Sequence, residues 1–174
     1  FERLKNNGFS GIEIAPNSIW NDFLETSDKD IEKFCKKLND YNLIISGING
    51  ISSILKNLNI MDQNNHEEIL YIFEKILYKI NILNTNILVF GCPNNRRPLL
   101  KHQKKNYQIA KNILYKIGDL IKKKNIFLAF EPLPSIYKCN FINNYKEGLD
   151  LINFINHPSI KLNLDTGTIY FNNY

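Results

Sequence analysis

Long apolar runs are absent from this sequence of 174 residues, although 44% of its residues are hydrophobic. No stretch of about 18 or more apolar residues occurs, so no transmembrane helix is predicted. No basic segment followed by an apolar run stands near the start, so no secretory signal is expected. Length and composition instead predict a single domain over residues 1–174 with a hydrophobic core, in a cytoplasmic protein without a membrane partner.

Cysteine is also scarce in this sequence. The three cysteines, Cys35, Cys92 and Cys139, are odd in number and far apart, and no CxxC pair occurs. This spacing argues against a disulfide framework and against a structural zinc site. We therefore expect reduced thiols.

The formal net charge of +5 raises the question of nucleic-acid contact. Many of the lysines lie in residues 101–125, where they are spread along one long amphipathic pattern. Such a distribution is more typical of a solvated helix face than of a nucleic-acid patch. We do not expect a nucleic-acid partner.

Apolar residues recur at helical spacing in four segments. In the first, Ile31, Phe34, Cys35 and Leu38 follow a plausible cap at Ser27. The four predicted helices cover residues 28–41, 66–83, 104–124 and 144–155.

Short apolar runs bounded by Gly, Pro or Asn lie between and beside these helices. They predict strands at residues 9–15, 42–48, 86–91, 126–131 and 160–165. Strands and helices alternate without a hairpin signal, and each connection is long enough to join parallel neighbours. The predicted class is therefore α/β with a parallel sheet.

The alternation of side chains within the strands distinguishes between two α/β architectures. In residues 160–165, isoleucine and leucine on one face alternate with Lys161, Asn163 and Asp165 on the other. A doubly wound sheet is covered by helices on both faces and should be apolar on both. A (β/α) barrel has helices outside only, and its inner face can be polar near the C-terminal rim. The alternation favours a barrel.

About five strands are fewer than the eight of a closed TIM barrel. The start of the chain, residues 1–8, is also typical of the end of a helix rather than of a first strand. We therefore expect a partial (β/α) TIM barrel with outer helices, from which the first strand and the last two strands are missing. It would be either a fragment of a longer enzyme or a natural truncation.

Five segments in order, GFSGIEIAP, LIISGI, NILVFGCPNNRRP, IFLAFEPLP and IKLNLDTG, resemble the xylose-isomerase-like TIM-barrel superfamily, in particular its sugar phosphate isomerase/epimerase group. The resemblance implies a divalent metal, Mg, Mn, Co or Zn, held by a Glu, an Asp, a His and a second Glu from successive later strands. Glu131 matches the first ligand and Asp165 the second; the others would lie beyond residue 174. Relatives often carry a His three residues after the Asp, where this chain has Thr168.

Glu131 and Asp165 each have a simpler interpretation beside the metal-binding one. Glu131 is expected to bind metal and to share in proton transfer, but a strand-end carboxylate can also point into water. Asp165 is expected to bind metal, but it can also form an Asx-type turn with Gly167.

Glu13, Ser46 and Arg97 are the candidate substrate-binding residues. Glu13 can alternatively pair with a lysine or hydrogen-bond across the barrel, and Ser46 can be a satisfied hydroxyl. Arg97, with its neighbour Arg96, lies in a loop where a guanidinium could hold a phosphate or sugar hydroxyls, or be solvated. The three histidines fall at helix ends, where no catalytic role is expected: His66, His102 and His157.

The expected function is a metal-dependent isomerase or epimerase of a small sugar, a sugar phosphate or a related hydroxy-ketone, with proton transfer through an enediolate. One alternative is a DNA-repair enzyme of the AP endonuclease type on the same barrel. That branch requires a three-zinc cluster fed by several histidines, and no histidine stands at a predicted strand end. The other alternative is a non-catalytic fragment. The expected partner is a small sugar, and the uncovered surface of a partial barrel would also favour a homo-oligomer.

Overall fold

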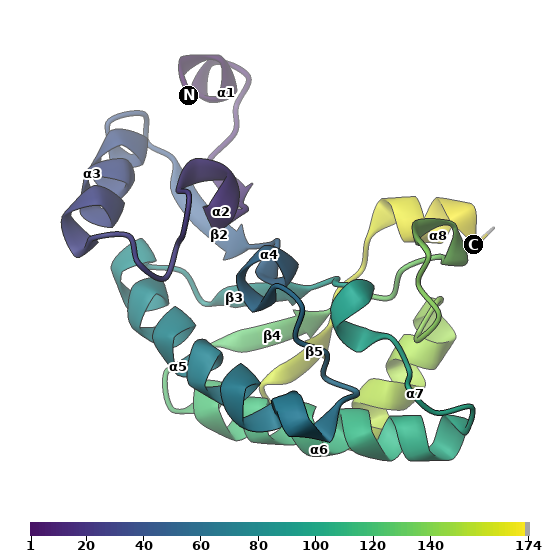
Figure 1. Cartoon of the computed structure of the whole chain (residues 1–174). Coiled ribbons are helices and arrows are strands. Elements are labelled where there is room, and N and C mark those ends of the chain that lie inside the picture. The colour runs from purple at the N-terminus through teal and green to yellow at the C-terminus, as the bar shows by residue number, and fades with distance from the viewer. Residues whose placement is uncertain (173–174) are drawn as a thin grey trace.

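The computed structural model describes residues 1–172, and Figure 1 shows the arrangement of its elements. The strands are β1 (Gly11–Ile14), β2 (Ile44–Ile48), β3 (Ile87–Phe90), β4 (Phe127–Phe130) and β5 (Ile160–Leu162). The longer helices are α3 (Asp28–Asn39), α5 (His66–Leu83), α6 (Gln103–Lys122) and α7 (Tyr145–Ile155). The shorter helices are α1 (Glu2–Asn6), α2 (Pro16–Ile19), α4 (Ile51–Leu55) and α8 (Thr166–Phe171). Single 3-10 turns are η1 (Gln63–Asn65), η2 (Asn94–Arg96) and η3 (Ser135–Tyr137).

The five strands form one parallel sheet in the order β1-β2-β3-β4-β5, as the alternation of strands and helices predicted. The long helices pack as successive neighbours, α3 on α5, α5 on α6 and α6 on α7. In Figure 1 they follow one another around the outside of the curved sheet. The predicted class is confirmed: the chain is a partial (β/α) barrel with outer helices.

The two faces of the sheet differ in how well they are covered. Leu88 and Phe90 of β3 and Leu128 of β4 point toward the helices and are fully buried. On the opposite, inner face, Ile87 is 38% exposed and Phe127 is 37% exposed. The hydrophobic core therefore lies between the sheet and the outer helices, and the inner face of the barrel wall is open within residues 1–172.

A bulge interrupts the pairing of β1 with β2. Ile12 is paired with Ile45, but Glu13 is paired with Gly47, so Ser46 is an extra residue in β2. A bulge of this kind bends the strand and increases its twist. The simple alternation predicted for β2 therefore does not continue through Ser46.

The strands end earlier than the sequence predicted at the two positions that matter for the site. β4 ends at Phe130 and β5 ends at Leu162, so Glu131 and Asp165 both follow their strands. Pro132 has no N–H to continue the ladder after Glu131. The prediction that Leu164 continues the apolar face of β5 was wrong, since this side chain is 67% exposed.

The predicted helices are confirmed with small shifts at their ends. The Ser27 side chain caps α3 by accepting a hydrogen bond from the N–H of Asp30 at 3.2 Å. The short helices α2, α4 and α8 were not predicted. No helix within residues 1–172 is long and apolar enough to cross a membrane.

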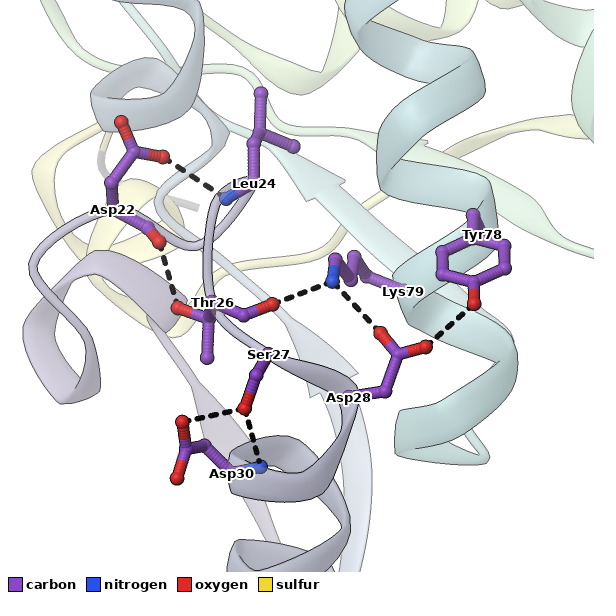
Figure 2. A network of polar contacts seen from close by, with 8 residues as sticks. All are labelled: Asp22, Leu24, Thr26, Ser27, Asp28, Asp30, Tyr78 and Lys79. Carbon is purple, nitrogen blue, oxygen red and sulfur yellow. Dashed lines mark hydrogen bonds and ion pairs between the residues drawn. The ribbon is translucent and has the colours of Figure 1, made fainter.

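A polar network fastens the start of α3 to α5 (Figure 2). The carboxylate of Asp28 accepts hydrogen bonds from Tyr78 Oη at 2.6 Å and from Lys79 Nζ at 2.9 Å. Lys79 Nζ also donates to the backbone oxygen of Thr26 at 2.6 Å. The largely buried ammonium group of Lys79 therefore bonds both to the loop before α3 and to the first residue of that helix.

Candidate functional site

Glu131 follows β4 at the carboxyl end of the sheet, which is where barrel enzymes carry their active sites. Its N–H donates to the backbone oxygen of Phe90 at 3.1 Å, which keeps the residue attached to β3. Its Oε1 accepts a hydrogen bond from Asn163 Nδ2, just beyond β5, at 2.9 Å. The half-buried side chain is thus held between the ends of two neighbouring strands.

The pKa of Glu131 is raised above its ordinary value, chiefly because burial disfavours the charged form. The hydrogen bond from Asn163 and the charge of Arg96 act in the opposite direction. The negative charges of Asp165 and Glu13 raise the pKa further. Two other carboxylates therefore lie near enough to act on Glu131 at this end of the barrel wall.

Asp165 caps the short helix α8. Its Oδ2 accepts a hydrogen bond from the N–H of Thr168 at 2.6 Å. The side chain therefore acts as a helix N-cap that bonds to Thr168, and not as the Asx-type turn with Gly167 that was the alternative interpretation. Capping occupies one lone pair of a carboxylate that has about four, so it is compatible with binding a cation.

Tyr145 fixes the main chain at Asp165. Its hydroxyl donates to the backbone oxygen of Asp165 and accepts from the N–H of the same residue, both at 2.5 Å. Burial raises the pKa of Tyr145, and the charges of Asp165 and Glu131 add to this effect. Tyr145 was not predicted as a site residue, because it stands in the first turn of α7, 20 positions away from the aspartate.

Glu13 and Ser46 come from β1 and β2. The exposed carboxylate of Glu13 accepts a hydrogen bond from Asn49 Nδ2 at 3.0 Å and contributes to the charge around Glu131. The hydrogen bond of Glu13 thus comes from a residue directly after the neighbouring strand β2, and neither from a lysine nor from across the barrel. Ser46 is the exposed extra residue of the bulge, beside the pair that Glu13 forms with Gly47.

The two neighbouring arginines have different surroundings. Arg97 is exposed, and its Nη2 donates to Asn94 Oδ1 at 3.2 Å. Arg96 is fully buried, and its Nη1 donates to the backbone oxygen of Glu131 at 2.7 Å. The structure therefore places Arg96, and not Arg97, against the residue that the sequence singled out.

The histidines lie at helix ends, as expected. His66 begins α5 and contacts the backbone oxygen of Ile60 at 2.8 Å. His102 directly precedes α6 and makes no capping bond with its side chain, whereas the buried His157 follows α7 and pairs with Asp119 at 3.2 Å. Two of these three side chains have structural partners of their own.

The carboxylate oxygens at this end of the sheet are of a type that binds divalent cations. Carboxylate oxygens are the ligands that Mg and Mn prefer, and Zn and Co also accept them. Glu131 and Asp165 provide two such groups at neighbouring strand ends. Within residues 1–172, however, no group of three or more His, Cys, Asp or Glu side chains is placed to hold a metal. The chemistry of the two carboxylates fits a cation, but within residues 1–172 they do not make up a complete set of ligands.

Consecutive parallel strands and outer helices define a segment of a (β/α) barrel, with two carboxylate residues just past the strand ends. The chain belongs to the xylose isomerase-like TIM barrel family, whose model matches residues 1–174. A comparison with curated proteins found no match.

Solved structures with the same fold include enzymes of different activities. A D-psicose 3-epimerase, solved in the presence of D-fructose, is 21% identical with a TM-score of 0.78 over 98% of this chain. An AP endonuclease of family 2 from Brucella melitensis is 16% identical with a TM-score of 0.74 over 96% of this chain. The chain spans 58% and 62% of the lengths of these two proteins.

Other neighbours with this fold contain metal ions. A xylose isomerase-like TIM barrel protein from Mycobacterium smegmatis, solved in complex with magnesium, is 20% identical with a TM-score of 0.65. It aligns with 97% of this chain, which spans 55% of its length. The IOLI protein, solved with a zinc atom, is 15% identical with a TM-score of 0.69 over 97% of this chain and 57% of its own.

Proposed function

We propose that the protein carrying this chain is a metal-dependent isomerase or epimerase of a small sugar, a sugar phosphate or a related hydroxy-ketone. The observation that carries the proposal is the half-buried carboxylate of Glu131, which burial and the charge of Asp165 keep at a raised pKa. The D-psicose 3-epimerase with the same fold supports the substrate class.

Glu131 is the proposed general base. It would take the proton from a carbon next to a carbonyl group, which gives an enediolate. Return of this proton to the neighbouring carbon would complete an isomerisation, whereas an epimerisation would need a second acid that protonates the same carbon from the opposite face. A base works best when its pKa lies near the operating pH, and burial shifts the pKa of Glu131 in that direction. The hydrogen bond from Asn163 to Oε1 would fix the orientation of the carboxylate during transfer.

Glu131 and Asp165 are the proposed ligands of a divalent cation, Mg, Mn, Co or Zn. When bound, the cation would supply Lewis-acid polarisation of neighbouring substrate oxygens. Tyr145 would hold the backbone of Asp165 in place for this role. Glu13, Ser46 and Arg97 remain the proposed substrate contacts, with the exposed guanidinium of Arg97 suited to a phosphate or to hydroxyl groups.

The test uses the full-length gene product that contains this chain. Glu131→Gln and Asp165→Asn are compared with the wild type for exchange of carbon-bound hydrogen in candidate ketoses with deuterated solvent, in the presence of each metal. We expect exchange to fall by roughly 10²–10⁴-fold in Glu131→Gln, the range typical for loss of a general base. Glu67→Gln, an exposed carboxylate in the first turn of α5, is the matched control.

Undiminished exchange in Glu131→Gln would disprove the role of this residue. Incision of abasic DNA by the wild type, without exchange on any ketose, would favour the AP endonuclease alternative instead. Absence of both activities in a folded, metal-loaded protein would favour a non-catalytic role.

A further inference from the structure

The space occupied by the Glu131 carboxylate exists because residue 91 is glycine. A Cβ placed on Gly91 would lie 1.9 Å from Glu131 Oε2 and 3.1 Å from its carboxyl carbon. No other side chain can therefore occupy position 91 while Glu131 keeps this orientation. Gly91 directly follows β3 and Glu131 directly follows β4, so the carboxylate of Glu131 lies across the end of the neighbouring strand.

Arg96 holds the main chain of the same residue. Its guanidinium carbon lies 4.7 Å from the centre of the Phe130 ring, and its Nη1 donates to the Glu131 backbone oxygen at 2.7 Å. Its Nη2 donates to Cys139 Sγ at 3.2 Å. The side chain is 0% exposed and forms no ion pair among the described residues, and its Nε has no hydrogen-bond partner there.

A fully buried arginine without a carboxylate partner is costly, since burying a charge is unfavourable unless it is paired. The backbone oxygen of Glu131 and the ring of Phe130 compensate for only part of this cost. A buried arginine at position 96 is therefore better explained by a role in holding Glu131 than by a contribution to stability. Both Gly91 and Arg96 lie in the segment between β3 and α6, and both act on Glu131.

We propose that Gly91 and Arg96 are positioning residues for Glu131: Gly91 leaves the space in which the carboxylate lies, and Arg96 anchors its backbone carbonyl. This inference deepens the proposed function. The effect of the two residues on metal binding and catalysis rests on that function, whereas their contacts with Glu131 do not. The inference assigns a purpose to the GCPNNRRP segment in which Arg97 had been the candidate residue.

Gly91→Ala should change the position of the Glu131 carboxylate without changing the stability of the protein. The atom that a Cβ at Gly91 would meet is the far end of the flexible Glu131 side chain, which can rotate away at little cost. Gly91→Ala should therefore displace the carboxylate while the protein stays folded and its thermal stability changes little. A glycine required only for packing would give the opposite result.

The primary measurement is independent of activity. Asn163 Nδ2 donates to Glu131 Oε1, so the side-chain amide signal of Asn163 in a nitrogen-15 NMR spectrum reports where the carboxylate lies. In Gly91→Ala this signal should move toward its position in Glu131→Ala, which lacks the acceptor. Arg96→Met should produce a change of the same kind, and Arg96→Lys, which keeps one donor and the charge, should restore part of it.

The second measurement is binding of Mn²⁺ to the full-length gene product, followed by calorimetry. We expect the affinity to fall by on the order of 10–100-fold in Gly91→Ala and in Arg96→Met, as is typical when a residue that orients a metal ligand is changed. Gly47→Ala is the control for a strand glycine, because its added Cβ would only meet Ile87 at an ordinary 3.5 Å. Lys79→Met is the control for loss of a buried cation distant in sequence from the site.

The outcomes separate the two proposals. An unchanged Asn163 signal in Gly91→Ala would overturn the positioning role, whatever the activity does, and a signal that moves equally in Lys79→Met would also overturn it. A displaced Asn163 signal in a protein whose wild type binds no Mn²⁺ would support the positioning role and contradict the proposed function. If Arg96→Met does not fold, Gly91→Ala alone decides.

Discussion

At the scale of the residue, the properties of Glu131 arise from atoms on separate segments of the chain. Asn163 donates to its carboxylate, Arg96 donates to its backbone oxygen, and Gly91 leaves the space for it. Burial nevertheless has the largest effect on its pKa, because removing a carboxylate from water disfavours the ionised form more than one hydrogen bond favours it. The ionised form of Glu131 therefore lowers the stability of the folded protein.

The pH dependence of stability follows from this raised pKa. The pKa of such a carboxyl group is higher in the folded state than in the unfolded state, where it is about 4.3. The folded protein therefore loses stability as the pH rises from the unfolded pKa through the folded one. Glu131→Gln keeps the Oε1 acceptor for Asn163 and removes the charge. We expect the variant to equal the wild type near pH 4 and to be the more stable of the two at pH 7, in metal-free buffer.

Urea denaturation at a series of pH values measures this difference. Asp150→Asn, an exposed carboxylate on α7, serves as the control and should show no such divergence from the wild type. A Glu131→Gln protein less stable than the wild type at pH 7 would show that the ionised carboxylate contributes to folding.

At the scale of the element, sequence periodicity predicted the long parts of the fold and missed the short ones. The helix over residues 66–83 was predicted to the residue, because 18 positions contain several repeats of the apolar period. Helix α8 has only six residues, too few to show a period, and its cap Asp165 was interpreted as a ligand or a turn residue. Contacts such as that of Gly91 with Glu131 join segments 40 positions apart and have no local signal in the sequence.

The packing of α6 gives a prediction at the same scale. Gly118 lies within this helix, where Gly→Ala ordinarily stabilises by about 0.5–1 kcal/mol. Here a Cβ would lie 2.5 Å from His157 Nδ1 and 2.7 Å from two other ring atoms. The ring cannot easily move, because Ser159 N–H donates to its Nδ1 and Asp119 contacts its Nε2.

We therefore expect Gly118→Ala to lower the free energy of unfolding by about 1–3 kcal/mol, the usual cost of overpacking a core. Thermal and chemical denaturation measure the change. Lys116→Ala, an exposed position on the same helix, is the control and should leave stability nearly unchanged. A stabilised Gly118→Ala protein would mean that helix α6 and His157 can separate without cost.

At the scale of the whole molecule, the sheet is covered on one face only. The order of the strands and the outer position of the helices were predicted, because alternation of polar and apolar residues separates the two faces. The exposure of the inner face is a property of the assembled wall: Ile44 is 64% exposed, Ile87 38% and Phe127 37%. β1 and β5 are also edge strands within the described residues. Proteins normally cover such edges and such apolar surface.

We expect the 174-residue chain, produced alone, to self-associate in the micromolar range, because burial of this inner face is favourable by about 25 cal/mol per Å² of apolar area. The variant Ile44→Thr/Ile87→Thr keeps β-branched residues in the strands and makes the inner face more polar, so it should associate less and remain folded. Sedimentation velocity over a concentration series measures the association.

The control variant Leu149→Gln/Tyr71→Gln removes exposed apolar groups from the outer helices and should associate as the wild type does. A wild-type chain that stays monomeric at every concentration, or equal association of both double variants, would show that the inner face does not drive self-association.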